Sequence, residues 1–277
     1  MRQRLPSHPT ACTSWGHSTT PPGACPRTRL LIIGCHEQPP TTTPPRTRVK
    51  ICGLTREQDV DAAVALGADA IGFVLYARSP RAVSAQRAAE LARRLPPFVT
   101  PVLLFVNASA TEVIAASACV AGATVQFHGD ETPEDCLRAT DGGRIPFIRA
   151  ARIPLGDAGA RFDLLEYAGH YPQARAILLD ALVEGYGGGG KAFNWSLLPP
   201  AVGCHLVLSG GLTPANVTDG IAQLRPRCQS LAVDVSSGVE ATAPDGSLLR
   251  GIKDAGKISR FIAAVRAADA ATAHTNS

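Results

Sequence analysis

Two side chains that can transfer protons stand at the ends of short apolar runs. Cys52 follows Val-Lys-Ile in "RVKICGLTREQD" (48–59), and Asp180 follows four apolar residues in "AILLDA" (176–181). A thiol and a carboxyl that face each other across a polar cavity can act as base and acid. Each also has a structural alternative, because a single cysteine is commonly a core residue and a strand-end aspartate is commonly a helix cap. Acid–base catalysis is therefore a hypothesis that requires the two runs to end at the same place.

Two glycine-containing turns could bind a phosphate group. "LSGGLTPANV" (208–217) leads from an apolar run into a helix expected to begin at Thr213-Pro214, and "DVSSGVE" (234–240) ends another run. Glycines let the backbone approach an oxyanion, hydroxyls add donors, and a helix N-terminus contributes unpaired N–H groups. One such turn is a weak signal because tight turns use glycine anyway, but two together favour a phosphate site. The predicted phosphate-binding residues are Gly210, Gly211, Ser236, Ser237 and Gly238.

From residue 49 onward, short apolar runs alternate with longer segments of helical periodicity, such as "REQDVDAAVALGA" (56–68) and "SAQRAAELARRL" (84–95). Runs that are apolar at nearly every position suit parallel strands covered on both faces by crossover helices. The runs are 49–53, 70–75, 101–107, 124–129, 146–153, 176–181, 205–211 and 230–238. Eight units predict an α/β fold, a closed (β/α)₈ TIM barrel in a single domain. An open doubly wound sheet is the alternative, although "CGLT" after the first run is not a dinucleotide-binding GxGxxG turn.

In a (β/α)₈ barrel, the C-terminal strand ends and the loops that follow them surround the active site. The polar residues at these ends are therefore the candidates for function. They are Cys52, Arg81 in "SPR", Asn107, Gln126, His128, Arg149, Asp180, Asp234 and the two glycine-containing turns. The predicted barrel brings all of them to one mouth.

Residues 1–47 differ from the rest of the chain in composition. They are rich in Pro, Thr and Arg, as in "EQPPTTTPPRTR" (37–48), and bury too little apolar surface to offset the entropy of ordering. We therefore expect a disordered N-terminal extension over 1–47, a catalytic barrel over 48–267 and a flexible tail over 268–277. A mis-called translation start, a targeting segment and a simple tail remain open as origins of the extension.

Charge and cysteine usage exclude several classes of function. Residues 1–48 carry six Arg and one Glu, whereas the remainder carries 21 basic and 22 acidic residues. The barrel therefore lacks the excess of basic residues expected of a nucleic-acid-binding domain. No apolar run approaches the roughly 20 residues that a membrane-spanning helix needs. The eight cysteines are scattered without a CxxC pair, which favours reduced thiols in a cytoplasmic compartment. Organellar targeting by the extension stays open.

Several motifs in order carry a resemblance to a known family. They are "KICGLT" (50–55), "GFVLYARSPR" (72–81), "FHGDE" (127–131), "LLD" (178–180) with "GGGGKAFNW" (187–195), "LSGGLTPANV" (208–217), "VDVSSGVE" (233–240) and "GIKD" (251–254). The sequence from about residue 49 to about residue 267 resembles phosphoribosylanthranilate isomerase of tryptophan biosynthesis. It departs from the family pattern at Phe127, Ser209 and Asn194, none of which is a proposed acid or base.

The resemblance implies a TIM barrel and an Amadori rearrangement without a cofactor or a metal. It is an aldose–ketose isomerisation, an intramolecular oxidoreductase reaction and the third step of the tryptophan branch. The substrate would be N-(5-phosphoribosyl)anthranilate and the product 1-(2-carboxyphenylamino)-1-deoxyribulose 5-phosphate. By similarity, Asp180 would be the general acid that protonates the ring oxygen, and Cys52 the general base that removes the C2 proton. A thiol base needs a lowered pKa and a carboxylic acid needs a raised one, so the site must shift the two pKa values in opposite directions.

The resemblance also implies substrate-binding roles for four further residues. Arg81 matches the position that meets the anthranilate carboxylate, for which a guanidinium fork is suited. His128 and its neighbour Gln126 would orient the substrate or a catalytic partner, and Asp234 would orient the site or brace its loop. The loop "YGGGGKAF" (186–193) is a candidate lid over the phosphoribosyl group.

Rival functions share the phosphate loops but need other residues. A metal-dependent pentose-phosphate epimerase would need several His and carboxylate ligands at the mouth, where only His128 stands at a strand end. The isomerases that also serve histidine biosynthesis use two aspartates, which Cys52 argues against. A non-catalytic phosphosugar-binding barrel would not need both an acid and a base. We therefore expect a small phosphosugar as the partner, no nucleic acid or membrane, and a cytoplasmic monomer or homodimer.

Overall fold

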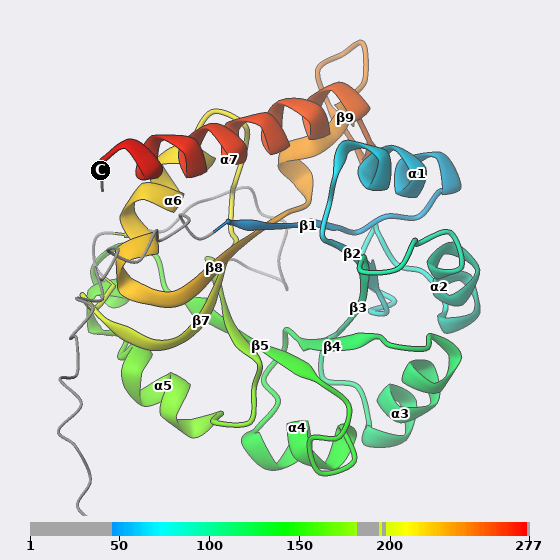
Figure 1. Ribbon diagram of the computed structural model, residues 1–277. Coiled ribbons are helices and arrows are strands. Elements are labelled where there is room, and N and C mark those ends of the chain that lie inside the picture. Colours follow the sequence, from blue (N-terminus) through cyan, green and yellow to red (C-terminus); the bar gives the residue numbers. More distant parts are fainter. Residues whose placement is uncertain (1–45, 182–193, 196–197, 276–277) are drawn as a thin grey trace, which may run out of the picture. The chain divides into compact units, whose positions relative to one another are not determined.

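The computed structural model describes residues 46–181, 194–195 and 198–275. Eight parallel strands form a closed barrel in chain order, with β8 paired to β1 (Figure 1). The strands are β1 (Arg48–Cys52), β2 (Ala70–Val74), β3 (Thr100–Phe105), β4 (Thr124–Phe127), β5 (Phe147–Ile153), β6 (Ala176–Ala181), β7 (Val202–Leu208) and β8 (Cys228–Val235). The prediction of a TIM barrel is therefore confirmed, and the open sheet is excluded.

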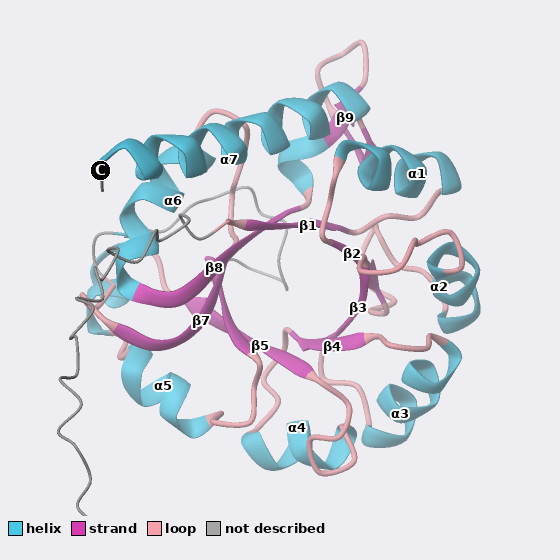
Figure 2. Ribbon diagram, viewed as in Figure 1, coloured by secondary structure: helices cyan, strands magenta, loops and turns pink. Residues whose placement is uncertain are grey.

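Helices surround the barrel, as the colours in Figure 2 show. They are α1 (Glu57–Leu66), α2 (Ala85–Ala92), α3 (Ala110–Cys119), α4 (Pro133–Ala139), α5 (Leu164–His170), α6 (Val217–Leu224) and α7 (Ala255–Thr275), with 3₁₀ turns η1 (Gly156–Arg161), η3 (Arg225–Arg227) and η4 (Ser237–Val239). Side-chain caps fix several starts: Ser109 and Thr132 each form a capping box with the residue three positions later. Within the described residues, none of the helices is long and apolar enough to cross a membrane.

The main core lies between the strands and the surrounding helices. Its largest fully buried side chains include Phe73, Phe127, Phe147 and Phe261. Phe127, which departs from the family pattern, packs edge-on against Phe147 with ring centroids 5.7 Å apart. Because successive side chains of a strand point to opposite faces, every strand that buries one set of residues under a helix presents the other set to the barrel interior. Polar residues of that inner set form the floor of the site.

Helix α6 begins later than expected. We predicted a start at Thr213-Pro214, but the helix begins at Val217. The Asn216 side chain accepts a hydrogen bond from the Thr213 backbone N–H (2.8 Å) and donates one to the Gly211 carbonyl (3.0 Å). These bonds hold residues 211–216 as a turn, because an asparagine side chain competes with the helical backbone for hydrogen bonds.

After the barrel strands, the chain forms a hairpin that we did not predict from the sequence. Strands β9 (Glu240–Thr242) and β10 (Leu248–Lys253) pair antiparallel beyond the end of β8. The turn between them contains Asp245 and Gly246, and Gly246 adopts a positive φ of 85°. A left-handed position favours glycine, so the "APDGS" segment was a usable turn signal.

Contacts and helical structure extend across the expected boundaries at 47 and 267. Thr47, placed in the extension, is only 2% exposed and bonds through its N–H and its hydroxyl to Asp269 of α7. Helix α7 itself continues to Thr275 and packs beside α1 and α6 (Figure 1). Residues 1–45 and the candidate lid 186–193 lie outside the described residues, so their expected disorder and lid role stay predictions.

Candidate active site

One pocket at the C-terminal ends of the strands brings together nearly all of the residues predicted from the sequence. It is lined by Cys52, Val74, Tyr76, Ser79, Arg81, Leu104, Gln126, His128, Asp180, Ser209, Gly210, Gly211, Leu212, Asp234, Val235, Ser236 and Ser237. Gly238 does not line it. The thiol of β1 and the carboxyl of β6 therefore share a cavity with both phosphate-loop candidates.

Asp180 is held by a chain of buried side chains. Its Oδ2 lies 2.8 Å from His128 Nε2, and His128 Nδ1 lies 3.0 Å from Gln126 Nε2. The Gln126 amide nitrogen faces Nδ1, so Nε2 is the ring nitrogen that contacts the Asp180 carboxyl. The other oxygen of Asp180 accepts the Ala181 backbone N–H at 2.9 Å. The carboxyl is thus fixed in orientation before a substrate arrives.

Cys52 ends β1 with its side chain buried, only 4% exposed. Directly after it, the N–H groups of Gly53 and Leu54 donate to the Gly72 carbonyl at 2.8 and 3.2 Å, which turns the chain. Gly53 has a φ of 75°, and a Cβ there would lie 2.5 Å from Arg81 Cδ. Glycine is therefore required after Cys52 both for the turn and for the packing of Arg81.

The protonation of Cys52 differs from what an active thiol base needs. Burial raises the pKa of the thiol, the Lys50 ammonium opposes this, and the Asp234 carboxylate adds to it. We expected a lowered pKa, whereas the net shift is upward because burial penalises the charged thiolate.

Asp234 of β8 contacts a residue that we did not single out. Its Oδ1 lies 2.9 Å from Lys50 Nζ, and both side chains are buried. Burial alone would lower the pKa of Lys50, but Asp234 and Cys52 raise it to about 12. A buried ion pair therefore lies beneath the pocket.

Arg81 lines the pocket, but Glu240 holds one edge of its guanidinium. Arg81 Nε and Nη2 donate to the two Glu240 carboxylate oxygens at 2.6 and 2.8 Å. Glu240 Oε1 also accepts the Gly251 N–H at 2.8 Å. The hairpin β9–β10 thus fixes the direction in which the arginine points.

Lys253 joins the same hairpin to the loop after β8. Its ammonium lies 3.3 Å from Glu240 Oε1 and donates to the Ser236 carbonyl at 2.9 Å. Burial lowers the pKa of Lys253 to about 8, with Glu240 opposing and Arg81 adding to the shift. Two charged groups, Glu240 and Lys253, therefore connect Arg81 to the loop of Ser236.

The two glycine-containing turns meet at the pocket in different ways. Gly210 and Gly211 have positive φ values of 79° and 65°. A Cβ at Gly210 would lie 2.8 Å from Asp180 Oδ1, so this glycine lets the β7 loop approach the carboxyl. Gly238 instead lies against the β7 loop, where a Cβ would be 2.0 Å from the Leu212 carbonyl oxygen. Its role is to let the two loops pack together, because it does not face the cavity.

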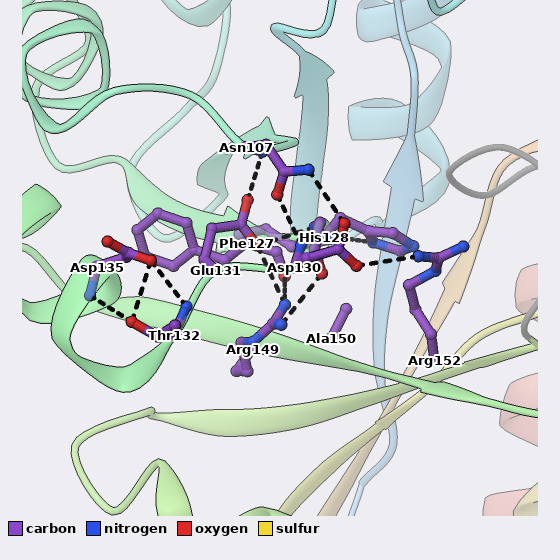
Figure 3. Close-up of polar contacts among 12 residues, drawn as sticks. Asn107, Phe127, His128, Asp130, Glu131, Thr132, Asp135, Arg149, Ala150 and Arg152 are labelled. Atoms are coloured by element: carbon purple, nitrogen blue, oxygen red, sulfur yellow. Dashed lines mark hydrogen bonds and ion pairs between the residues drawn. The ribbon is translucent and has the colours of Figure 1, made fainter.

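Two other strand-end candidates, Asn107 and Arg149, do not line the pocket and belong to a polar cluster beside it (Figure 3). Glu131 connects them: its carboxylate accepts the Asn107 N–H at 2.7 Å and the Gly129 N–H at 2.9 Å, and pairs with Arg149 at 3.2 Å. Arg149 also donates to the Phe127 and Gly129 carbonyls. These bonds hold the loop after β4, and therefore His128, in place.

Residues missed from the sequence fall into two groups with different signals. Glu240 and Lys253 stood in the quoted motifs, and the turn signal between them would have placed them on one hairpin. Lys50 is two residues before Cys52, so strand alternation would have placed both on one face. A charged residue inside an otherwise apolar run was the available signal.

Among the described residues, no three His, Cys, Asp or Glu side chains are grouped so as to hold a metal ion.

Comparisons with known proteins agree on one family. The family model described as "N-(5'phosphoribosyl)anthranilate (PRA) isomerase" matches residues 49–264. A protein of that name from Methylibium petroleiphilum is 59% identical over 228 residues, which cover 82% of this chain and 98% of the relative. The crystal structure of phosphoribosyl anthranilate isomerase from Thermotoga maritima has a TM-score of 0.67 at 39% identity, over 80% of this chain and 99% of the other.

A second solved structure of that enzyme carries a ligand. It is described as a complex with reduced 1-(o-carboxyphenylamino)-1-deoxyribulose 5-phosphate. It is 35% identical to this chain with a TM-score of 0.61, and it covers 80% of this chain and 99% of the other.

Proposed function

The chain belongs to the N-(5'-phosphoribosyl)anthranilate isomerase family, and from this premise we propose that Cys52 and Asp180 are its general base and general acid. The reaction converts N-(5-phosphoribosyl)anthranilate to 1-(2-carboxyphenylamino)-1-deoxyribulose 5-phosphate, an aldose–ketose isomerisation in tryptophan biosynthesis. The observation that carries the assignment is that the thiol of β1 and the carboxyl of β6 line the same pocket.

The first step opens the ribose ring. The carboxyl proton of Asp180 passes to the ring oxygen, the bond from C1 to that oxygen breaks, and the anthranilate nitrogen supplies electrons to form an iminium. His128 and the Ala181 N–H bind the carboxylate that remains. Hydrogen bonds to the charged form stabilise it, so they favour the release of the proton.

The second step removes the C2 proton. The Cys52 thiolate takes it, the electron pair of the C2–H bond forms the C1–C2 double bond, and the iminium nitrogen recovers its lone pair. The enolamine then tautomerises: its C2 hydroxyl loses a proton, C1 gains one, and the ketone results. Each step transfers a proton, the first also breaks the bond from C1 to the ring oxygen, and no external oxidant or reductant enters the balance.

Substrate binding follows from the charges around the pocket. We assign Arg81 to the anthranilate carboxylate, because Glu240 holds its Nε edge and leaves Nη1 as the further donor edge. The phosphate belongs to the turns of Gly210, Gly211, Ser236 and Ser237, which line the pocket from the β7 and β8 loops. Gly238 supports these loops by packing.

Substitution of the two catalytic residues tests this proposal. Cys52→Ala and Asp180→Asn should each lower turnover by roughly 10² to 10⁴, the contribution of one proton-transfer group. Turnover is followed as the loss of phosphoribosylanthranilate fluorescence, with thermal melting of each variant as the control for folding. Addition of a chelator should leave the parent rate unchanged, in contrast to a metal-dependent epimerase. Variants that stay within about tenfold of the parent would contradict the assignment.

We place the chain in the cytoplasm as a monomer or a homodimer with a phosphosugar as its small-molecule substrate. Light scattering of the purified chain distinguishes the two oligomeric states.

A further inference from the structure

Lys50 lies directly beneath the proposed base. On β1, side chains two residues apart point to the same face, so Lys50 and Cys52 both project into the barrel interior. Both residues are only 4% exposed. A lysine ammonium is costly to bury, and such a residue needs a partner or a function.

Gly72 lets the two groups come together. Its backbone pairs with Cys52 in the β1–β2 register, and it carries no side chain into the interior. A Cβ at this position would lie 2.8 Å from Cys52 Sγ and 3.0 Å from Lys50 Nζ. Sulfur and ammonium therefore border the same small space.

The charges that act on Cys52 come from three strands. Lys50 on β1 and Lys253 on β10 favour the thiolate, whereas Asp234 on β8 disfavours it. Arg81, His128 and Asp180 line the same pocket. Asp234 contacts the ammonium of Lys50 at 2.9 Å and so fixes the position of that cation.

We propose that Lys50 is a positioning residue for the reaction: its ammonium, held by Asp234, stabilises the Cys52 thiolate and sets the pH range in which Cys52 acts as a base. This inference rests on the proposed role of Cys52. The cation offsets part of the desolvation that otherwise keeps the thiol neutral. Lys50 borders the same space as Cys52 and does not itself line the pocket, so it acts through Cys52.

A purely structural role for the ion pair predicts a different pattern. If Lys50 and Asp234 only stabilised the barrel, then Lys50→Met and Asp234→Asn would both lower the melting temperature and leave the titration of Cys52 in place. If the two charges instead act electrostatically on the thiol, Lys50 and Asp234 must shift the pKa of Cys52 in opposite directions. Removing the cation must make the thiolate harder to form, and removing the anion must make it easier.

The test titrates the Cys52 thiol directly in the full chain. Alkylation by iodoacetamide is followed against pH by mass spectrometry of the peptide that contains Cys52, so the other cysteines do not interfere. We expect Lys50→Met to move the midpoint upward by at least about one pH unit, and Asp234→Asn to move it downward. Lys50→Arg, which keeps the charge, should stay closer to the parent. If Lys50→Met does not fold, the double variant Lys50→Met/Asp234→Asn removes the unpaired carboxylate and is compared with Asp234→Asn.

Kinetics supply the second readout. At neutral pH, kcat of Lys50→Met should fall at least about tenfold with little change in KM, and should recover as the pH rises. An unchanged alkylation midpoint in the Lys50 variants, or shifts of the same sign for both charges, would overturn the inference. The alkylation result does not depend on activity, so a failure of the Cys52 assignment would be recognised separately, through a Cys52→Ala variant that remains active.

Discussion

Cys52 combines two requirements that oppose each other. Its position at the end of β1 places the sulfur in the pocket, but the same burial raises the pKa of the thiol. His128 and the Ala181 backbone N–H contact the two oxygens of Asp180 and fix the orientation of its carboxyl. The sequence was sufficient to place both residues at strand ends. It was not sufficient to predict the protonation of Cys52, which depends on Lys50, Asp234 and the depth of the site rather than on the residue type.

The raised pKa of Cys52 predicts how the activity of the parent enzyme depends on pH. Only the thiolate removes the C2 proton, and a raised pKa moves its formation to higher pH. We therefore expect kcat/KM to rise from pH 6 towards pH 9, by up to about tenfold for each pH unit while the thiol is mostly neutral. The measurement is the initial rate at substrate concentrations well below KM across this range. A profile that stays level throughout would show that Cys52 is already ionised, or that it is not the base.

At the scale of elements, what could be predicted follows from burial. The eight strands were readable because parallel barrel strands are covered on both faces and remain apolar along their length. The β9–β10 hairpin had only its turn as a signal, because it lies outside the barrel wall and the first three residues of β10 are exposed. Its contribution to the site comes from charged side chains at its ends, Glu240 and Lys253, whose partners are distant in sequence. Only the folded chain brings Glu240 to Arg81.

The hairpin predicts an effect on substrate binding without a loss of chemistry. Glu240→Gln keeps the size of the side chain but replaces the carboxylate that accepts two bonds from Arg81. Arg81 should then lose its fixed direction. Because Arg81 is assigned to substrate binding and not to proton transfer, KM should rise by about tenfold while kcat changes less. Loss of one partner of a buried charged pair costs several kcal/mol, and much of this should appear as a lower stability of the fold. Asp245→Asn, at the exposed turn of the same hairpin, is the matched control. A fall in kcat with an unchanged KM would contradict this role for Glu240.

At the scale of the whole molecule, the family relationship and the fold describe the same segment. The relative from Methylibium petroleiphilum aligns over 98% of its own length with 82% of this chain, and the family model begins at residue 49. The family match therefore begins with the first strand of the barrel. The exact start could not be read from composition, because Thr47 resembles the Thr-rich segment before it and yet bonds to α7.

The start of the barrel can be located by truncation, which is a prediction about the whole chain. We propose that residues 1–45 are dispensable, so a chain beginning at Arg46 should keep the melting temperature and activity of the full chain. A chain beginning at Arg48 also loses Thr47, whose N–H and hydroxyl donate to Asp269 at 2.8 and 2.6 Å. Two lost bonds to a partly buried carboxylate cost about 2 to 4 kcal/mol, so its melting temperature should fall by several degrees. The pocket lies at the other end of the strands, so kcat should persist at temperatures below the transition. Equal melting of the two truncated chains would show that Thr47 is not part of the barrel, and lower activity of the longer one would show that the extension contributes to function.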